Sequence, residues 1–445
     1  MIPSQRVYFL LSLGVAIAAL FATFFDLTTS LAVTGCFDLV VLGLTAIDGW
    51  RVRSTRVEVS REPLSKLSIG RENPVRLFLK FTQKSTRQAA RVLIRDDYPS
   101  DFHASEEQLQ KRIPADSHSE LTYTVYPRHR GEFEWGDIWM RQLGDWGLAW
   151  HQWRVPQSQT VAVYPDLVGL RSLSIRLTLQ SAGNLSRSRN FSMGTEFAEL
   201  REYTIGDDPR SIDWKATARR AATSGHDPLQ VRVLEAEQEQ TLTILLDRGR
   251  LMTARVKGLQ RFDWGLNATL SLALAGLNRG DRVGVGVFDR DASVWLPPER
   301  GQHHLYQLIE RLTPIQPVFL EPDYMGVLTR MMRQQTRRAL VVVITDLVDA
   351  TASEELLGAL QRLTPRYLPF CVTLRDPQVD AIARTPTQDV GSAYDRAVAL
   401  DLLAQRQVAF ARLQRKGVLV LDAPVDEIST QLVDRYLRLK ARNRI

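Results

Sequence analysis

The chain contains the stretch GTEFAELREYTIGDDPRSIDWKATARR at Gly194–Arg220, followed by TLTILLDRGRLM at Thr241–Met252. The first segment is denser in charge, turn residues and tryptophan than core packing or solubility requires. The second segment places Asp247 directly after an apolar strand, where open α/β sheets bind their ligands. The second segment therefore predicts a sheet of the α/β class, and the first marks a specialised region just before it.

From Thr241 onward, apolar strands alternate with amphipathic helices. The predicted strands are TLTILL, VGVGVF, ALVVVIT, LPFCVTL and GVLVL, and the predicted helices lie near residues 262–278, 305–312, 324–335, 354–363, 394–415 and 426–442. This alternation is typical of a parallel sheet with helices on both faces. We therefore expect a doubly wound α/β domain over residues 236–445.

Residues 51–165 have a different pattern, with short stretches that alternate between apolar and polar residues. VRLFLKF, AARVLIRD, LTYTVYP and EFEWGDIWM are typical of strands and are separated by turn signals. We expect a β-sandwich-like domain here. Residues 166–235 are then a linker followed by the charged segment, and the polar, weakly periodic residues 166–193 predict a surface connection.

Two apolar runs, Val7–Phe25 and Leu31–Ile47, occupy most of residues 1–50. Each is close to the roughly 20 residues that a helix needs to cross a bilayer. The connection at 26–30 has no Lys or Arg, whereas basic residues flank the pair, namely Arg6, Arg51, Arg53 and Arg56. The positive-inside rule therefore predicts a transmembrane helical hairpin with both ends in the cytoplasm.

Asp38 lies midway along the second apolar run, where a charge costs about 2.5 to 3.5 kcal/mol on insertion scales. One interpretation is a polar contact to a partner helix or a proton-linked site. The other is a protonated or hydrogen-bonded aspartate within the hairpin, for example with Thr34. We favour the second because no other ionisable residue lies in the middle of either run.

Composition excludes several classes of function. The net charge of +7 over 445 residues is spread along helical stretches without a nucleic-acid-binding motif, so no nucleic-acid partner is expected. The two cysteines, Cys36 and Cys371, lie in a predicted membrane helix and a predicted strand, which excludes a disulfide framework. Phosphate-binding loops, nucleophile elbows and H-E-x-x-H motifs do not occur in the sequence.

In the charged segment, Asp208 is a good helix N-cap and Pro209 suits the first helical position, so a helix is predicted to run to about Ala222. Arg210 and Asp213 are three residues apart, close enough to pair along this helix. The segment is either an internally paired structural element or an interaction surface, and both interpretations stay open. The candidate interaction residues are Glu199, Arg201, Glu202, Asp207, Asp208, Arg210, Asp213, Trp214, Lys215 and Arg219.

The sequence GTEFAELREYTIGDDPRSIDWKATARR resembles the signature of the bacterial "domain of unknown function 58" proteins. The resemblance implies a C-terminal domain similar to von Willebrand factor type A domains. It also implies as partners a MoxR-type AAA+ ATPase and other type A domain proteins, whose genes commonly accompany the family. With the hairpin, it implies a location in the bacterial inner (cytoplasmic) membrane.

Type A domains that bind a divalent metal use a D-x-S-x-S loop after the first strand, together with a Thr and an Asp from later loops. Such oxygen ligands suit Mg²⁺. Here Asp247 is the first aspartate, but Gly249 and Leu251 occupy the serine positions and offer no hydroxyl. Asp323 and Asp346 are the other candidate ligands. We expect a degenerate site whose aspartates cap loops and helices, with Mg²⁺ binding as the alternative and no other cofactor.

These observations predict a membrane-anchored protein-interaction module rather than an enzyme. It would be an adaptor or assembly factor that works with a MoxR-type AAA+ ATPase. The alternative is a divalent-metal-dependent hydrolase that uses the carboxylates at the C-terminal edge of the sheet.

Overall fold

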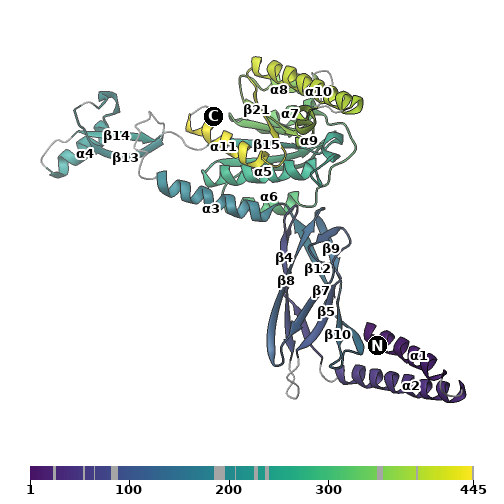
Figure 1. Cartoon of the computed structure of the whole chain (residues 1–445). Helices are drawn as coiled ribbons and strands as arrows, with labels where there is room; N and C mark the ends of the chain where they lie inside the picture. The colour runs from purple at the N-terminus through teal and green to yellow at the C-terminus, as the bar shows by residue number, and fades with distance from the viewer. Residues whose placement is uncertain are drawn as a thin grey trace. The chain divides into compact units, whose positions relative to one another are not determined.

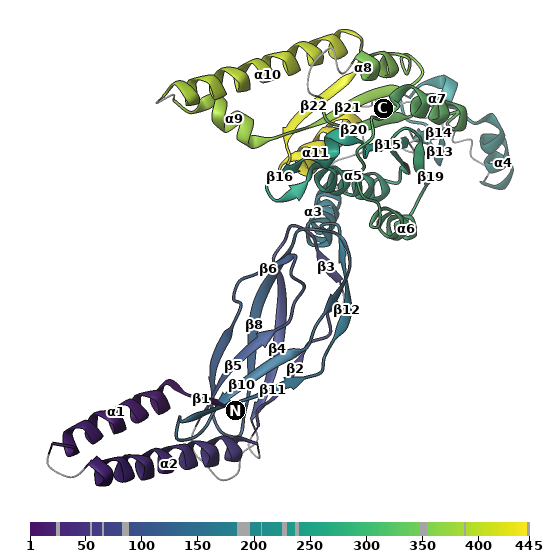
Figure 2. The ribbon, with the colours of Figure 1, turned by 90° about the vertical axis from the view of Figure 1, so that its right-hand side faces the viewer.

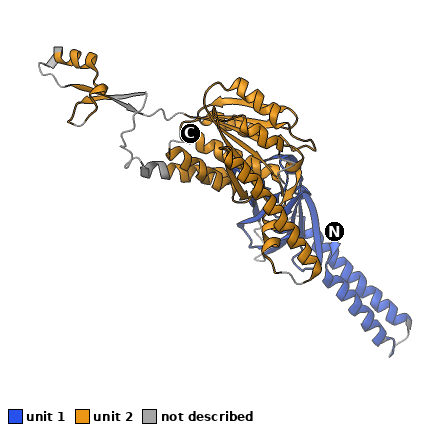
Figure 3. Cartoon of the chain, turned by 90° about the horizontal axis from the view of Figure 1, so that it is seen from above, with its two compact units in different colours: residues 1–167 blue, residues 168–445 orange. Residues whose placement is uncertain are grey.

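The structure is a computed structural model of the chain. It describes residues 1–23, 27–53, 56–64, 66–81, 89–184, 196–205, 207–224, 229–235, 240–347, 354–386 and 389–442. The chain forms two compact units, residues 1–167 and 168–445 (Figure 3). Helices and sheets are mixed in a multi-domain architecture.

The first unit begins with a short strand, β1 (Ile2–Pro3), and two helices, α1 (Gln5–Phe21) and α2 (Leu27–Val52). The two helices lie side by side (Figure 2). Many of their large apolar side chains are exposed, which is unusual for the core helices of a globular domain. Among the described residues, the stretch Thr28–Val52 is long and apolar enough to cross a membrane, and Gln5–Leu20 is apolar but shorter.

Asp38 lies half-buried in α2 and faces α1. A Cβ atom placed on Gly14 of α1 would lie 3.2 Å from Asp38 Oδ1, so the glycine permits close approach of the helices at this level. The Thr34 hydroxyl donates to the Ser30 carbonyl at 2.8 Å and not to Asp38. The expected pair between Asp38 and Thr34 is therefore wrong, because the threonine satisfies its hydroxyl within its own helix.

Asp48 fixes the end of α2 to the β-rich part of the unit. Its carboxylate accepts hydrogen bonds from the backbone amides of Trp146, Leu148 and Ala149, at 3.1, 2.9 and 3.2 Å. The side chain is 1% exposed overall. These amides lie in and just after the turn that joins β10 (Ile138–Leu143) to β11 (Ala149–Val155). The strand β1 pairs with β11 beside this contact, so helix and sheet are joined by hydrogen bonds.

Most of the first unit consists of three sheets. The further strands are β2 (Glu58–Arg61), β3 (Lys66–Ser68), β4 (Asn73–Phe81), β5 (Ala90–Asp96), β6 (Phe102–Ala104), β7 (Leu109–Ile113), β8 (Ser117–Pro127), β9 (Gly131–Trp135) and β12 (Gln159–Tyr164). The strand orders are β1-β11-β10-β5-β7, β2-β4-β8-β6 and β3-β12-β9. The long strands β4 and β8 lie side by side (Figure 1). Buried and exposed residues alternate along all nine residues of β4, which therefore has one face in the core.

The predicted strand EFEWGDIWM is two strands, β9 and β10, which pair in different sheets. The chain changes direction at Gly136, whose amide donates to the Asp97 carbonyl at 2.7 Å. A Cβ at Gly136 would lie 2.5 Å from the Asp97 side chain, so the turn requires glycine.

A buried polar cluster joins strands of all three sheets. Tyr123 of β8 donates to Asp96 Oδ2 of β5 at 2.6 Å, and Trp135 Nε1 of β9 donates to Asp96 Oδ1 at 3.1 Å. Arg61 of β2 lies 3.3 Å from the same carboxylate. Burial raises the pKa of Asp96, while Arg61 and the two hydrogen bonds oppose that shift. One buried carboxylate thus links strands of the three sheets.

Helix α3 (Leu167–Asn184) occupies the start of the segment that was expected to be a surface connection. The segment is helical here, and most of its described side chains are exposed or half-buried. Among residues 167–179, whose burial is described, Leu170 and Leu177 are buried, seven positions or two turns apart. Such a narrow apolar stripe is hidden among serines and arginines in the sequence. Residues 185–195 lie outside the described residues.

The second unit contains a six-stranded sheet. Its strands are β15 (Thr241–Asp247), β18 (Arg282–Phe288), β19 (Ala292–Glu299), β20 (Leu340–Thr345), β21 (Leu368–Arg375) and β22 (Leu419–Pro424). The order is β19-β18-β15-β20-β21-β22, and every pair is parallel except β18 with β19. The five predicted strands are confirmed. The unpredicted β19 contains Pro297 and Pro298, which strands tolerate at a sheet edge.

Helices cover both faces of this sheet (Figures 1 and 2). They are α5 (Arg261–Asn278), α6 (Gln302–Leu312), α7 (Tyr324–Gln334), α8 (Glu354–Gln361), α9 (Pro377–Arg384), α10 (Val390–Arg415) and α11 (Ile428–Ala441), with the short elements η2 (Arg250–Thr253), β16 (Arg255–Val256) and β17 (Leu259–Gln260). Leu245 packs with residues of α7, α8 and α10, whereas Leu246 lies against Gly265 of α5. Successive residues of β15 thus enter opposite layers, and all seven are buried.

Candidate functional site

The charged segment folds as a small unit of its own, which we call the arm. It comprises β13 (Glu196–Glu202), the 3₁₀ turn η1 (Pro209–Ser211), helix α4 (Trp214–Ser224) and β14 (Gln230–Glu235). The strands β13 and β14 form an antiparallel pair, and Ile212 bridges to Val231. The predicted single helix is therefore interrupted, because Ile212 is extended and separates η1 from α4.

Two aspartates begin the two helical pieces of the arm. Asp208 caps η1, with Pro209 next to it, as the sequence predicted, and its Oδ1 accepts from the Arg210 amide at 3.0 Å. Asp213 Oδ1 accepts from the amides of Lys215 and Ala216, both at 3.0 Å, and thereby caps α4. The second cap was not predicted, because it follows from the break at residue 212.

Ion pairs hold the arm together. Arg201 Nη1 donates to Asp207 Oδ2 at 2.8 Å, and this pair lowers the pKa of Asp207 to about 2. Arg232 Nε donates to Asp213 Oδ2 at 2.7 Å, which lowers the pKa of Asp213. The expected pair of Arg210 with Asp213 is therefore wrong, because β14 supplies the partner.

The other candidate residues lie on the outside of the arm. Trp214 is 67% exposed, and Ile205 is fully exposed. Asp208, Arg210, Lys215 and Arg219 are exposed as well. Glu202 is exposed and lies 3.5 Å from Arg220. Glu199 belongs to β13, but its side chain is outside the described part of the chain.

The candidate metal ligands lie in the α/β part and serve different purposes. Asp247, at the end of β15, is 1% exposed. Its Oδ2 accepts from Thr345 Oγ1 at 2.7 Å and from the Tyr324 hydroxyl at 3.0 Å. Its Oδ1 accepts from the Gly249 amide at 2.7 Å. Burial raises the pKa of Asp247 to about 6, even though these three hydrogen bonds favour the ionised form.

Asp346, just after β20, is held between two arginines. Arg261 Nη1 donates to its Oδ2 at 2.6 Å, and Arg406 Nη1 donates to its Oδ1 at 2.9 Å. The Leu347 amide also donates to Oδ1, at 2.8 Å. Two guanidinium groups against one carboxylate repel any cation that approaches this side chain.

Asp323 is the N-cap of α7 and accepts from the Gly326 amide at 2.7 Å. Its neighbour Tyr324, rather than Asp323 itself, reaches Asp247. Within the described part of the chain, no three His, Cys, Asp or Glu side chains gather as metal ligands. This donor set does not fit Mg²⁺, which prefers several free oxygen ligands and its own waters.

Several important residues of this sheet edge were missed from sequence, namely Tyr324, Thr345, Arg261 and Arg406. Arg406 is the clearest case, because it lies in a long, polar helix and looks like a surface residue. Its second nitrogen, Nη2, donates to Asp422 Oδ1 at 2.8 Å. No local pattern signals a contact between positions 60 residues apart.

Known proteins resemble parts of the chain. Residues 199–410 match the family model described as "Protein of unknown function DUF58". Uncharacterized proteins of Mycobacterium tuberculosis (strain ATCC 25618 / H37Rv) and Mycobacterium bovis (strain ATCC BAA-935 / AF2122/97) are 22% identical over 213 residues, 47% of this chain. The chain spans 64% of the length of these relatives.

Solved structures similar to the chain include the conserved hypothetical protein BatB from Bacteroides thetaiotaomicron and an aerotolerance-related membrane protein from Bacteroides fragilis NCTC 9343 with multiple mutations to serines. Each has a TM-score of 0.31 and 15% identity and covers 46% of this chain and 99% of its own. The SpRpn10 VWA domain has a TM-score of 0.28 and 11% identity, over 44% of this chain and 94% of its own. These TM-scores are too low to define a fold, which rests on the strand order above. Residues 199–410 of the chain are therefore similar to the DUF58 family, in keeping with the resemblance of its charged segment.

Proposed function

We propose that this protein is a membrane-anchored protein-interaction module, an adaptor or assembly factor for a MoxR-type AAA+ ATPase. The observation that carries the proposal is the exposure of an aromatic and a basic side chain on the surface of the arm. Trp214 begins α4 with two thirds of its surface exposed, beside Lys215. A solvated tryptophan next to cations is typical of the residues that contribute most to protein interfaces.

The internal pairs of the arm support this role. Asp207 and Asp213 are engaged by Arg201 and Arg232, so these four residues fix the shape of the arm. Arg210 and Lys215 form no ion pair with other described residues. Their charges are available to a partner with acidic side chains, and a preformed arm loses little entropy when it binds.

The membrane part of the proposal rests on the two N-terminal helices. We infer a transmembrane hairpin in the bacterial inner membrane, followed by a β-sandwich-like domain and a von Willebrand factor type A-like domain in the cytoplasm. The exposed apolar surface of α1 and α2 supports insertion, since little of the Thr28–Val52 stretch is buried in protein. Arg51 lies in the last turn of α2 and Arg53 and Arg56 follow the helix, which supports the cytoplasmic orientation.

The hydrolase alternative has less support from the site geometry. Asp346 is paired with two arginines, and three donors already occupy the oxygens of Asp247. Neither carboxylate is therefore placed to hold a metal-bound water.

The test is capture of the full-length, detergent-solubilised chain by a purified MoxR-type ATPase from the same bacterium. We expect Trp214→Ala with Lys215→Glu to weaken capture by at least about tenfold, as the loss of interface hot-spot residues does. The matched control is Tyr394→Ala with Arg415→Glu, which changes one exposed aromatic and one exposed cation on α10. Equal capture of the variant and the wild type, or no capture of the wild type, contradicts the proposal.

A further inference from the structure

A cavity of about 470 Å³ opens where α2 meets the β-rich part of the first unit. It is lined by Arg53, Arg56, Val57, Glu58, Val59, Trp153 and Val155. Arg53 directly follows α2, Arg56 and Val57 precede β2, and the other lining residues belong to β2 and β11. The cavity therefore lies directly beyond the end of the apolar helix.

Neither arginine of this cavity forms an ion pair with a described carboxylate. Among the described residues, no carboxylate lies within ion-pair distance of Arg53 or Arg56. Glu58 lines the cavity but forms no ion pair with either of them. Arg56 Nη2 lies 3.1 Å from His151 Nε2, and its guanidinium carbon lies 5.6 Å from the centre of the Trp153 ring. These contacts hold the guanidinium in place without neutralising it.

His151 is neutral in this arrangement. It is 5% exposed, and burial, with a further contribution from Arg56, lowers its pKa. The neutral ring accepts the Arg56 hydrogen bond at Nε2. Its Nδ1 has no hydrogen-bond partner in the described part of the chain. The buried His151 side chain thus orients the Arg56 guanidinium towards the cavity.

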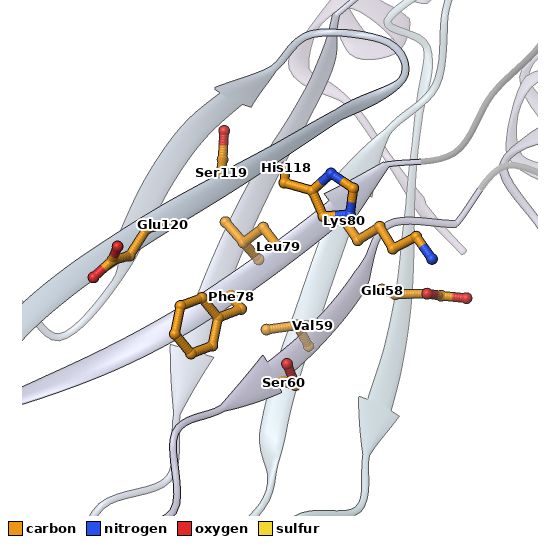
Figure 4. A pocket seen from close by; sticks show the side chains of 9 residues that line it. All are labelled: Glu58, Val59, Ser60, Phe78, Leu79, Lys80, His118, Ser119 and Glu120. Carbon is orange, nitrogen blue, oxygen red and sulfur yellow. The ribbon is translucent and has the colours of Figure 1, made fainter.

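A neighbouring cavity differs in the charges that line it. About 550 Å³ in volume, it lies on β2, β4 and β8, as Figure 4 shows. In the strand register Lys80 stands opposite both Glu58 and His118, and Glu120 lies on the same strand as His118. Acidic and basic groups alternate on this surface, so it has no preference for an anion.

The surroundings of the arginine cavity match a membrane boundary. Trp50, near the end of α2, is 70% exposed, and the Arg51 guanidinium carbon lies 4.9 Å from the centre of the Trp146 ring. Aromatic and basic residues of this kind are enriched at the headgroup level. Asp48 fixes the height of the cavity relative to the helix through its three amide contacts.

We propose that this cavity binds the phosphate headgroup of an anionic phospholipid, such as phosphatidylglycerol, from the membrane that holds α2. The proposal rests on the membrane anchoring inferred above. Arginine forks match phosphate oxygens, and basic pockets on the cytoplasmic side of a bilayer bind anionic headgroups. The apolar lining from Val57, Val59 and Val155 suits the glycerol part of the lipid.

The test is native mass spectrometry of the full-length chain in a neutral detergent, titrated with phosphatidylglycerol or phosphatidylcholine. We expect the wild type to prefer phosphatidylglycerol. Arg53→Gln with Arg56→Gln should weaken phosphatidylglycerol binding roughly 30-fold, at about fivefold per arginine, and leave phosphatidylcholine unchanged. The phosphatidylglycerol affinity of Arg53→Lys with Arg56→Lys should lie between those of the wild type and the glutamine variant. Lysine keeps the charge but loses the paired N–H donors of the guanidinium.

The control is Arg95→Gln with Arg112→Gln, which removes the same charge from exposed positions on β5 and β7. Equal phosphatidylglycerol affinity in the wild type and the glutamine variant overturns the proposal, as does equal affinity of the wild type for both lipids. Displacement of phosphatidylglycerol by millimolar inorganic phosphate also overturns it, since the site then serves a soluble anion. Extraction of the wild type from membranes by alkaline carbonate contradicts the anchoring instead and is measured separately.

Discussion

Arg406 donates a 2.9 Å hydrogen bond to Asp346 from a helix 60 residues further along the chain. Its other terminal nitrogen donates to Asp422 at 2.8 Å, so one guanidinium bridges the chain just after β20 and the strand β22. The side chain is almost fully buried, as are both carboxylates. This bridge lies at the C-terminal ends of the parallel strands, where open α/β sheets bind their ligands.

Replacing Arg406 by Ala leaves two buried carboxylates without their shared partner. We expect the free energy of unfolding of the α/β part to fall by about 3 to 5 kcal/mol. Urea-dependent proteolysis of the full-length chain measures this change. Arg412→Ala, at an exposed position on the same helix, is the control and should stay within about 0.5 kcal/mol of the wild type. Similar losses in both variants would contradict the role of the bridge.

Mg²⁺ tests the assignment of the carboxylates. Because arginines and hydroxyls already engage Asp346 and Asp247, millimolar Mg²⁺ should leave the melting temperature of the full-length chain unchanged. Differential scanning fluorimetry with Mg²⁺ and with matched ionic strength from NaCl separates specific binding from screening. A rise in melting temperature that Asp247→Asn abolishes would restore the hydrolase alternative.

Asp247 predicts a pH dependence of stability. Its pKa is about 6 in the folded chain and about 4 when unfolded, so between these values the folded state holds the extra proton. The contribution of Asp247 to stability therefore falls as the pH rises from 4 to 6 and is constant above that. Asparagine does not titrate, so the stability of Asp247→Asn relative to the wild type should rise by roughly 2 kcal/mol between pH 4 and pH 7. Urea unfolding followed by tryptophan fluorescence tests this, and a pH-independent difference between the two proteins would refute it.

The contacts of Asp48 should protect the turn between β10 and β11 from hydrogen exchange. Asp48→Ala removes the acceptor for three backbone amides, so hydrogen exchange at Trp146, Leu148 and Ala149 should accelerate at least about tenfold. Asp145→Ala, in the same turn but exposed, should leave these amides protected. Unchanged exchange in Asp48→Ala would show that other contacts hold the turn.

The sequence predicted those parts of the fold that depend on local pattern. The five apolar strands of the α/β part were recognised because parallel strands buried on both faces are apolar throughout. Strand β19 was missed because Pro297 and Pro298 argue against a strand, and α3 was missed because its buried stripe is narrow. In the arm, the cap at Asp208 follows from its neighbours, but the partner of Asp213 is Arg232, 19 residues away, which only the β13–β14 pairing reveals.

The hydrogen bonds between Asp48 and the turn after β10 fix the end of α2 to the β-rich part of the first unit. If α2 spans the bilayer as proposed, this helix of 26 residues cannot change its tilt without moving the strands that are fixed to its end. A helix whose apolar stretch is longer than the hydrocarbon layer can accommodate the mismatch by tilting. In that arrangement, a membrane of different thickness would reorient the β-rich part of the first unit together with α2.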